Sequence, residues 1–123
     1  MLSPLAAMRA IAVVEDDAAF GNALQYALEA QGYAVSLFDR AQAAIDSREI
    51  LSTDCLLIDL PDGLTTLGAL RRRRLTCPAI LMGANLTARS RKEALEAGAI
   101  VLEKPVMGDV LNALLREVLA DPR

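Results

Sequence analysis

The sequence has no histidine and no tryptophan, and it contains few cysteines and few aromatic residues. Among 123 residues there are two cysteines, and aromatic residues make up 3%. Without histidine, a Cys/His zinc cluster cannot form, and Ser–His or Cys–His nucleophilic catalysis has no base. Cys55 and Cys77 show no CxxC spacing, so we interpret them as small apolar core residues of a reducing compartment rather than as a disulfide.

The chain also lacks a strong excess of one charge and any long apolar run. Its 13 basic and 16 acidic residues give a net charge of −3, which argues against the uniformly basic surface of DNA-binding modules. We interpret Arg71–Arg74 as the solvated end of a helix and predict no direct nucleic-acid binding. No run approaches the roughly 18 residues of a membrane span, and no basic region precedes the apolar stretch in Met1–Met8. We therefore expect a cytoplasmic protein without membrane contact.

What the chain does have is the size of one domain and a regular alternation of apolar patterns. A mass of 13.1 kDa allows roughly two-thirds of the unfolded surface to be buried and leaves no room for a second domain. We predict a domain over residues 9–120, between a flexible extension at 1–8 and a tail at 121–123. Five short apolar runs are typical of strands: Ala10–Val14, Tyr33–Phe38, Cys55–Ile58, Ala79–Met82 and Ala99–Leu102.

Segments with apolar residues every three or four positions follow these runs and predict helices. The first begins near Phe20 and ends at Gly32, and the others are Ala41–Ile50, Leu64–Arg74, Thr87–Ala97 and Val106–Ala120. Strict alternation, with strands that are apolar on both faces, predicts a three-layer α/β sandwich around a parallel sheet. In such sheets ligands bind outside the carboxyl ends of the strands.

Charged residues stand at three of these strand ends. Glu15, Asp16 and Asp17 follow the first run, Asp59 follows the third, and Lys104 lies after the fifth. If these ends share one edge, the carboxylates converge, and a hard divalent cation such as Mg²⁺ relieves their repulsion. A lysine suits a phosphoryl anion at the same place. The alternative is that Asp16 or Asp17 caps the next helix and Asp59 is a turn residue.

Taken together, the motifs resemble the receiver domains of two-component response regulators. The resemblance covers about residues 9–120 and rests on five strings in this order: Val13-Val14-Glu15-Asp16-Asp17, Leu56-Leu57-Ile58-Asp59-Leu60, Cys77-Pro78-Ala79-Ile80-Leu81-Met82, Ala94-Leu95-Glu96-Ala97-Gly98-Ala99 and Glu103-Lys104-Pro105.

The resemblance implies a doubly wound, flavodoxin-like fold with five parallel strands in the order 2-1-3-4-5. It makes Asp59 the phosphoacceptor for a histidine kinase or phosphotransfer partner. It makes Glu15 and Asp16, together with Asp59 and a backbone carbonyl near Pro61, the ligands of Mg²⁺. Lys104 then pairs with the phosphoryl oxygens.

The resemblance has two further implications, and the chain also departs from the family's pattern at several positions. Asp17 is expected to cap the first helix, and the bond before Pro105 to be cis. The family usually has Ser or Thr where this chain has Gly83, and an aromatic residue where it has Val101. The switch positions are therefore degenerate. The loop before Pro61 looks short by two residues.

The leading hypothesis is a stand-alone receiver that is phosphorylated on Asp59 in a Mg²⁺-dependent reaction and signals through protein contacts. It is not an enzyme beyond its own phosphorylation and dephosphorylation. The alternative is a degenerate receiver that works as a phosphorylation-independent interaction module. An Asp-nucleophile phosphatase is disfavoured, because Asp59 and Asp62 are three residues apart rather than two. A further hypothesis, held beside a monomer, is a homodimer through a face built by Thr87–Ala97, the strand with Val101, and Val106–Ala120.

Overall fold

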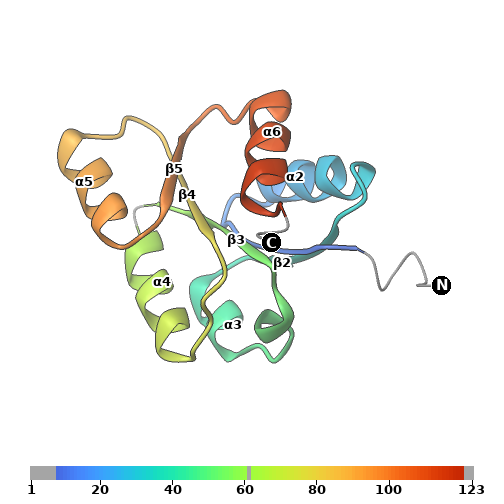
Figure 1. Ribbon diagram of the computed structural model, residues 1–123, viewed down its shortest axis with the longest axis horizontal. Coiled ribbons are helices and arrows are strands. Elements are labelled where there is room, and N and C mark those ends of the chain that lie inside the picture. The colour runs from blue at the N-terminus through green and yellow to red at the C-terminus, as the bar shows by residue number, and fades with distance from the viewer. Residues whose placement is uncertain (1–7, 61, 121–123) are drawn as a thin grey trace.

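The computed structural model describes residues 8–60 and 62–120 (Figure 1). Strands and helices alternate along this part of the chain. In order they are β1 (Ala10–Val14), α2 (Ala18–Ala30), β2 (Ala34–Phe38), α3 (Ala41–Asp46), a 3₁₀ turn η1 (Glu49–Ser52), β3 (Cys55–Asp59), α4 (Gly63–Arg72), β4 (Ala79–Gly83), α5 (Ala88–Glu96), β5 (Ile100–Glu103) and α6 (Gly108–Val118).

The five strands form one sheet in the order β2-β1-β3-β4-β5, and every neighbouring pair is parallel. This confirms the predicted fold class and strand order. The register pairs Val14 with Ile58 and Asp59 with Met82, so the residues that follow β1 and those that end β3 lie at the same edge. The register thereby brings together the charged residues that the sequence places after these strands.

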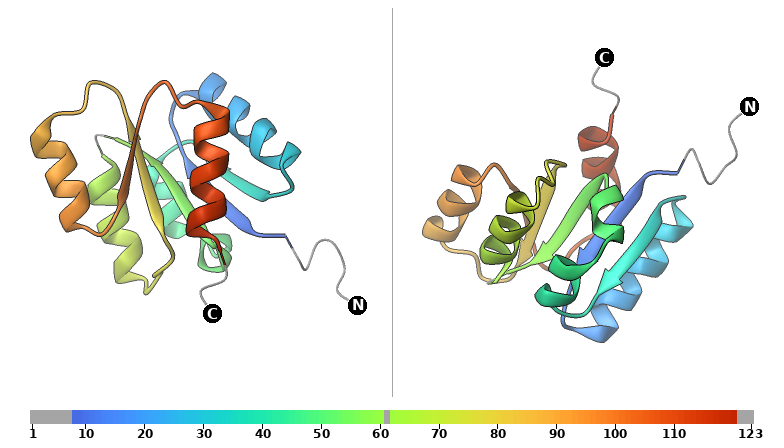
Figure 2. Two further views of the ribbon diagram at one scale, coloured as in Figure 1. Left: turned by 45° about the horizontal axis from the view of Figure 1, so that its top comes forward. Right: turned by 90° about the horizontal axis from the view of Figure 1, so that it is seen from below.

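Helices cover both faces of the sheet. Figure 1 and the left view of Figure 2 place α2 and α6 over one face, and the right view of Figure 2 shows α3 and α4 in front of the other. Neighbouring strand residues accordingly enter different cores: Leu56 and Ile58 pack with α3, α4 and α5, whereas Leu57 packs with α2 and α6. Each buried aliphatic side chain contributes about 1.5–3 kcal/mol, so apolar strands stabilise both layers.

The helix predicted over Ala41–Ile50 is wrong beyond Asp46. Regular helix stops at Asp46, Ser47 is extended, and η1 follows at Glu49. Two features account for the break. Ile50 is completely buried on the α3 side of the sheet. The Arg73 guanidinium donates hydrogen bonds to the carbonyls of Ile45 and Ser47, which satisfies backbone acceptors that a longer helix would use.

The interpretation of Arg71–Arg74 as a solvated run holds for Arg72 and Arg74, which are exposed, but is wrong for Arg71 and Arg73. Arg71 donates from Nη1 to the carbonyl oxygens of Leu75 and Cys77, at 2.8 and 2.7 Å. Arg71 thus closes the loop after α4, and Arg73 ties α4 to the end of α3. The other predicted ends lie within two residues of those observed. Gly32 and Gly98 have φ of +95° and +75° after α2 and α5, as expected of terminating glycines.

Both cysteines are free thiols, as the sequence predicts. Burial raises the pKa of the Cys55 thiol to about 12, which makes it unreactive. None of the helices in residues 8–60 and 62–120 is long and apolar enough to cross a membrane.

Gly68 offers a direct test of the α4 assignment. A Cβ at this position would meet only the Arg72 guanidinium, at 3.7 Å. We expect Gly68→Ala to raise the free energy of unfolding by about 0.5–1 kcal/mol, because alanine loses less backbone entropy in a helix. Urea denaturation measures this change. Gly32→Ala is the control with the opposite expected sign, because φ of +95° strains alanine and should lower the free energy of unfolding. A rise in the free energy of unfolding for Gly32→Ala, or no rise for Gly68→Ala, would contradict the assignment.

Candidate functional site

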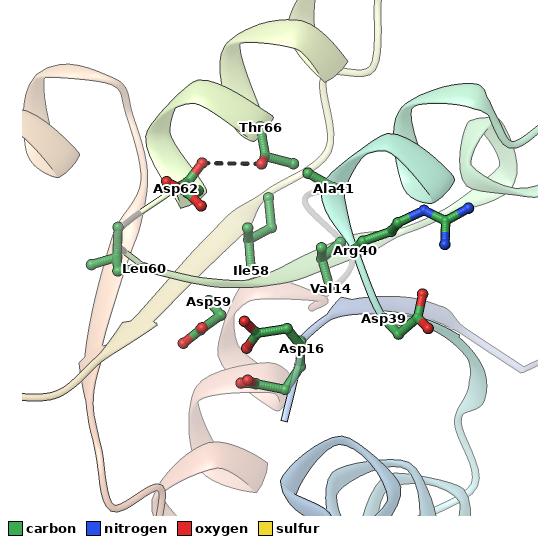
Figure 3. Close-up of a pocket in the computed structure, with 11 residues that line it drawn as sticks. Val14, Asp16, Asp39, Arg40, Ala41, Ile58, Asp59, Leu60, Asp62 and Thr66 are labelled. Atoms are coloured by element: carbon green, nitrogen blue, oxygen red, sulfur yellow. Dashed lines mark hydrogen bonds between the residues drawn. The ribbon is translucent and has the colours of Figure 1, made fainter. Parts of the chain in front are cut away.

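Three carboxylates meet at the carboxyl edge of the sheet. Glu15 and Asp16 follow β1, and Asp59 is the last residue of β3. One oxygen from each lies within 4.8 Å of the others. Figure 3 shows Asp16 and Asp59 side by side in a pocket of about 180 Å³. The structure therefore brings together the three carboxylates that the sequence predicts at this edge.

Lys104 supplies the positive charge of this cluster. It follows β5, where its N–H donates to the carbonyl of Gly83 at 2.8 Å. Its Nζ donates to Oδ1 of Asp59 at 2.7 Å and to Oε1 of Glu15 at 3.1 Å. The Lys104–Pro105 peptide is cis, as the resemblance implies. Residues at the carboxyl ends of β1, β3 and β5 thus form one network of ion pairs.

Burial controls the electrostatics of the network. Glu15 is only 2% exposed, and this burial raises the pKa of its carboxyl group, although hydrogen bonds from the Asp17 N–H and Lys104 oppose the shift. Partial burial by itself lowers the pKa of Lys104, but hydrogen bonds to Asp59 and Glu15 outweigh it and leave the pKa raised. Lys104 therefore carries its positive charge at neutral pH.

The donor set fits a hard divalent cation. Three carboxylates face one ammonium, so negative charge is in excess, and carboxylate oxygen is the ligand type that Mg²⁺ prefers. Glu15, Asp16 and Asp59 are the residues that would hold the ion. The predicted fourth ligand, the backbone carbonyl of Pro61, lies outside the described residues.

In the described part of the chain, the other charged residues around the pocket do not contact the carboxylate cluster through their charged groups. Oδ1 of Asp17 accepts the N–H of Phe20 at 3.1 Å and caps α2, as predicted. Asp39 and Arg40 line the pocket, but Figure 3 shows the Arg40 guanidinium directed away from Asp59. The cation that faces the carboxylates is therefore Lys104.

At Gly83, apolar side chains crowd the space that a side chain on this residue would enter. A Cβ built on Gly83, the last residue of β4, would lie 2.8 Å from Cδ2 of Leu86 and 3.1 and 3.2 Å from Cδ1 and Cβ of Leu60. Val101 is partly buried and packs against the α4-side core. Sequence reasoning identified Gly83 and Val101 as departures but missed Leu60 and Leu86. A leucine within the polar loop after β4 was the available signal.

Sequence reasoning also missed a contact of Phe20. The Lys104 Nζ lies 4.7 Å from the centroid of the Phe20 ring. The residue was assigned only to the apolar stripe of the first helix. Its position four residues after the acidic pair Glu15 and Asp16 was the signal that could have pointed to the site.

Comparison with known proteins agrees with this geometry. The sequence model of the response regulator receiver domain family matches residues 11–116. Transcriptional regulatory protein FixJ of Bradyrhizobium diazoefficiens is 32% identical over 114 residues, covering 89% of this chain and 56% of that protein. Transcriptional regulatory protein ZraR of Escherichia coli is 32% identical over 115 residues, covering 89% of this chain and 26% of that protein. The chain thus spans about half or less of the length of these curated relatives.

Solved structures share the fold. Chemotaxis protein CheY4 of Vibrio cholerae superposes with a TM-score of 0.83 at 22% identity, covering 92% of this chain and all of that one. The non-phosphorylated HemR receiver domain of Leptospira biflexa gives 0.82 at 25% identity, covering 94% and 97% of the two chains. The sequence match, the sheet topology and the acidic edge lead to one conclusion: the chain belongs to the response regulator receiver domain family.

Proposed function

We propose that the chain accepts a phosphoryl group on Asp59 from the phosphohistidine of a kinase or phosphotransfer protein, in a Mg²⁺-dependent reaction, and signals through protein contacts. The observation that carries the proposal is the convergence of Glu15, Asp16, Asp59 and Lys104 at one sheet edge. The domain acts on no other substrate: it catalyses at most its own phosphorylation and dephosphorylation.

The chain's own residues divide the work of the transfer. Lys104 holds Oδ1 of Asp59, which leaves Oδ2 to attack phosphorus. An O–P bond forms, the P–N bond of the donor breaks, and its electron pair leaves with the imidazole. A carboxylate nucleophile needs no base to deprotonate it, which suits a sequence without histidine. Lys104 then pairs with a phosphoryl oxygen. A bound Mg²⁺ would neutralise charge on the phosphoryl oxygens.

Intact-protein mass spectrometry tests the proposal. After incubation with Mg²⁺ and acetyl phosphate, we expect the wild type to gain one phosphoryl group. Asp59→Asn, which keeps the size of the side chain but removes the nucleophile, and a chelator-treated sample are expected to gain none. An increment that persists in Asp59→Asn would place the acceptor elsewhere. Absence of any increment, also with purified kinases as donors, would reject the proposed function.

The packing at Gly83 favours a second candidate function, an interaction module that ignores phosphorylation. Gly83 has no hydroxyl to contact a phosphoryl group, and Leu60 and Leu86 crowd the position that a Cβ would take. The two functions differ in one respect. For a module of this kind, a partner binds wild type and Asp59→Asn equally well, with or without acetyl phosphate. For a phosphorylated signal, the affinity changes only in the wild type.

Two further expectations about partners remain predictions. A homodimer through α5, β5 and α6 is supported by exposed apolar side chains on or next to these elements, namely Leu95, Met107 and Val110. Absence of direct nucleic-acid binding is supported by the use of Arg71 and Arg73 in backbone hydrogen bonds.

A further inference from the structure

The ammonium group of Lys104 has an aromatic neighbour as well as two carboxylates. Its Nζ lies 2.7 Å from Asp59 Oδ1, 3.1 Å from Glu15 Oε1 and 4.7 Å from the centroid of the Phe20 ring. An ammonium within about 6 Å of a ring face is attracted by the ring quadrupole. Phe20 therefore holds the lysine from a third side.

The ring itself is fixed by the start of α2. Phe20 is the third residue of the helix, and its N–H donates to Oδ1 of the N-cap residue Asp17 at 3.1 Å. The side chain is partly buried and packs against the core between the sheet and α2 and α6. The cap and the core thus aim the ring at Lys104.

This third contact differs from the other two in its chemistry. Asp59 and Glu15 belong to the proposed reaction, Asp59 as the nucleophile and Glu15 as a ligand of the ion. The Phe20 ring has no atom that reacts or coordinates. Lysine has a long, flexible side chain that loses considerable rotamer freedom when held, and Lys104 is a quarter exposed to solvent. A non-reacting contact limits this freedom throughout the transfer.

We propose that Phe20 is a positioning residue for Lys104: its ring keeps the ammonium within reach of Asp59 and so accelerates phosphoryl transfer. The acceleration rests on the proposed function, whereas the ring–ammonium contact can be tested without it.

The first test is NMR of protein labelled with ¹³C-lysine. The sequence has two lysines, Lys92 and Lys104, so each spectrum has an internal reference in the exposed Lys92. We expect the ε-methylene protons of Lys104 to lie upfield of those of Lys92 because of the ring current. Phe20→Leu, which keeps an apolar side chain, should remove the shift, and Phe20→Tyr should retain it. A Lys104 shift unchanged in Phe20→Leu would overturn the proposal.

The second test is a double-mutant cycle on the rate of phosphorylation by acetyl phosphate with Mg²⁺. We expect Phe20→Leu to slow the reaction about two- to fivefold and Phe20→Tyr to restore it. In the Lys104→Ala background, Phe20→Leu should have no further effect, since its action passes through the lysine. Equal slowing in both backgrounds would show a merely structural role and overturn the proposal. If the wild type accepts no phosphoryl group, the proposed function fails, and the NMR result alone confirms or overturns the positioning.

Discussion

Replacing Lys104 with methionine is expected to lower the free energy of unfolding by about 2 kcal/mol at pH 7.5 in metal-free buffer, and by clearly less at pH 5. The variant leaves Glu15 buried with its charge and without its cationic partner. Loss of one partner of a fully buried pair costs about 3–5 kcal/mol. A smaller value is expected here because Lys104 is a quarter exposed and water screens the pair.

The pH dependence follows from the direction of the Glu15 shift. Burial already raises the pKa of Glu15, and removing Lys104 deletes a hydrogen bond that lowers it. The folded variant therefore binds a proton at a pH where the unfolded chain has already lost it. Stability is lost as the pH rises from the pKa of the unfolded chain to the higher pKa of the folded state, and it is recovered as the pH falls back through that window.

Urea denaturation at the two pH values measures this effect. Lys92→Met is the matched control, because Lys92 is exposed on α5 and its replacement should change stability by less than about 0.5 kcal/mol at either pH. An equal loss at pH 7.5 and pH 5 for Lys104→Met would show that lost packing, rather than the unpaired carboxylate, causes the destabilisation.

Gly83→Thr, which restores the residue type usual in the family, is expected to lower the free energy of unfolding by about 1–3 kcal/mol. The new Cβ would lie 2.8 Å from Leu86 Cδ2 and within 3.2 Å of Leu60 Cβ, so the side chains of Leu86 and Leu60 must shift. Overpacking of this kind costs about that much. Denaturant unfolding of the purified variant measures the change.

The companion variant Leu86→Ala identifies the cause. Removing the leucine side chain vacates the space that the threonine needs, so Gly83→Thr should cost less in the Leu86→Ala background than in the wild type. Additive effects would show that the clash lies elsewhere, for instance with Leu60. Gly68→Ala serves as the control for adding a side chain to a glycine, because that position is open.

Most of the fold could be predicted because its three central strands, β1, β3 and β4, are buried on both faces. Runs such as Cys55–Ile58 are continuously apolar, and only a parallel sheet covered on both sides gives every such residue a dry environment. The failure at Ala41–Ile50 has a tertiary cause. Arg73, distant in sequence, binds the carbonyls of Ile45 and Ser47, and local spacing carries no trace of that interaction.

Only the part of the site that consists of charged residues at strand ends could be predicted from the sequence. The positions of Asp59 and Lys104 at strand ends follow from topology, since parallel strands bring their carboxyl ends together. Contacts between apolar side chains carry no such signal. Phe20 looks like any helix stripe residue until β5 brings Lys104 to its ring, and Leu86 looks like an ordinary loop residue until it packs on Gly83.

The residues of the network that joins Glu15, Asp59 and Lys104 are also synthesised in a fixed order. Its two carboxylates are synthesised first, and the lysine that pairs with them comes 45 residues after the second. Chains are made at about 5–20 residues per second, so the acidic edge of a nascent domain stays without its cation for some seconds. During that interval the carboxylates of β1 and β3 repel one another. The emergence of β5 therefore completes the charge balance of the domain as well as its sheet.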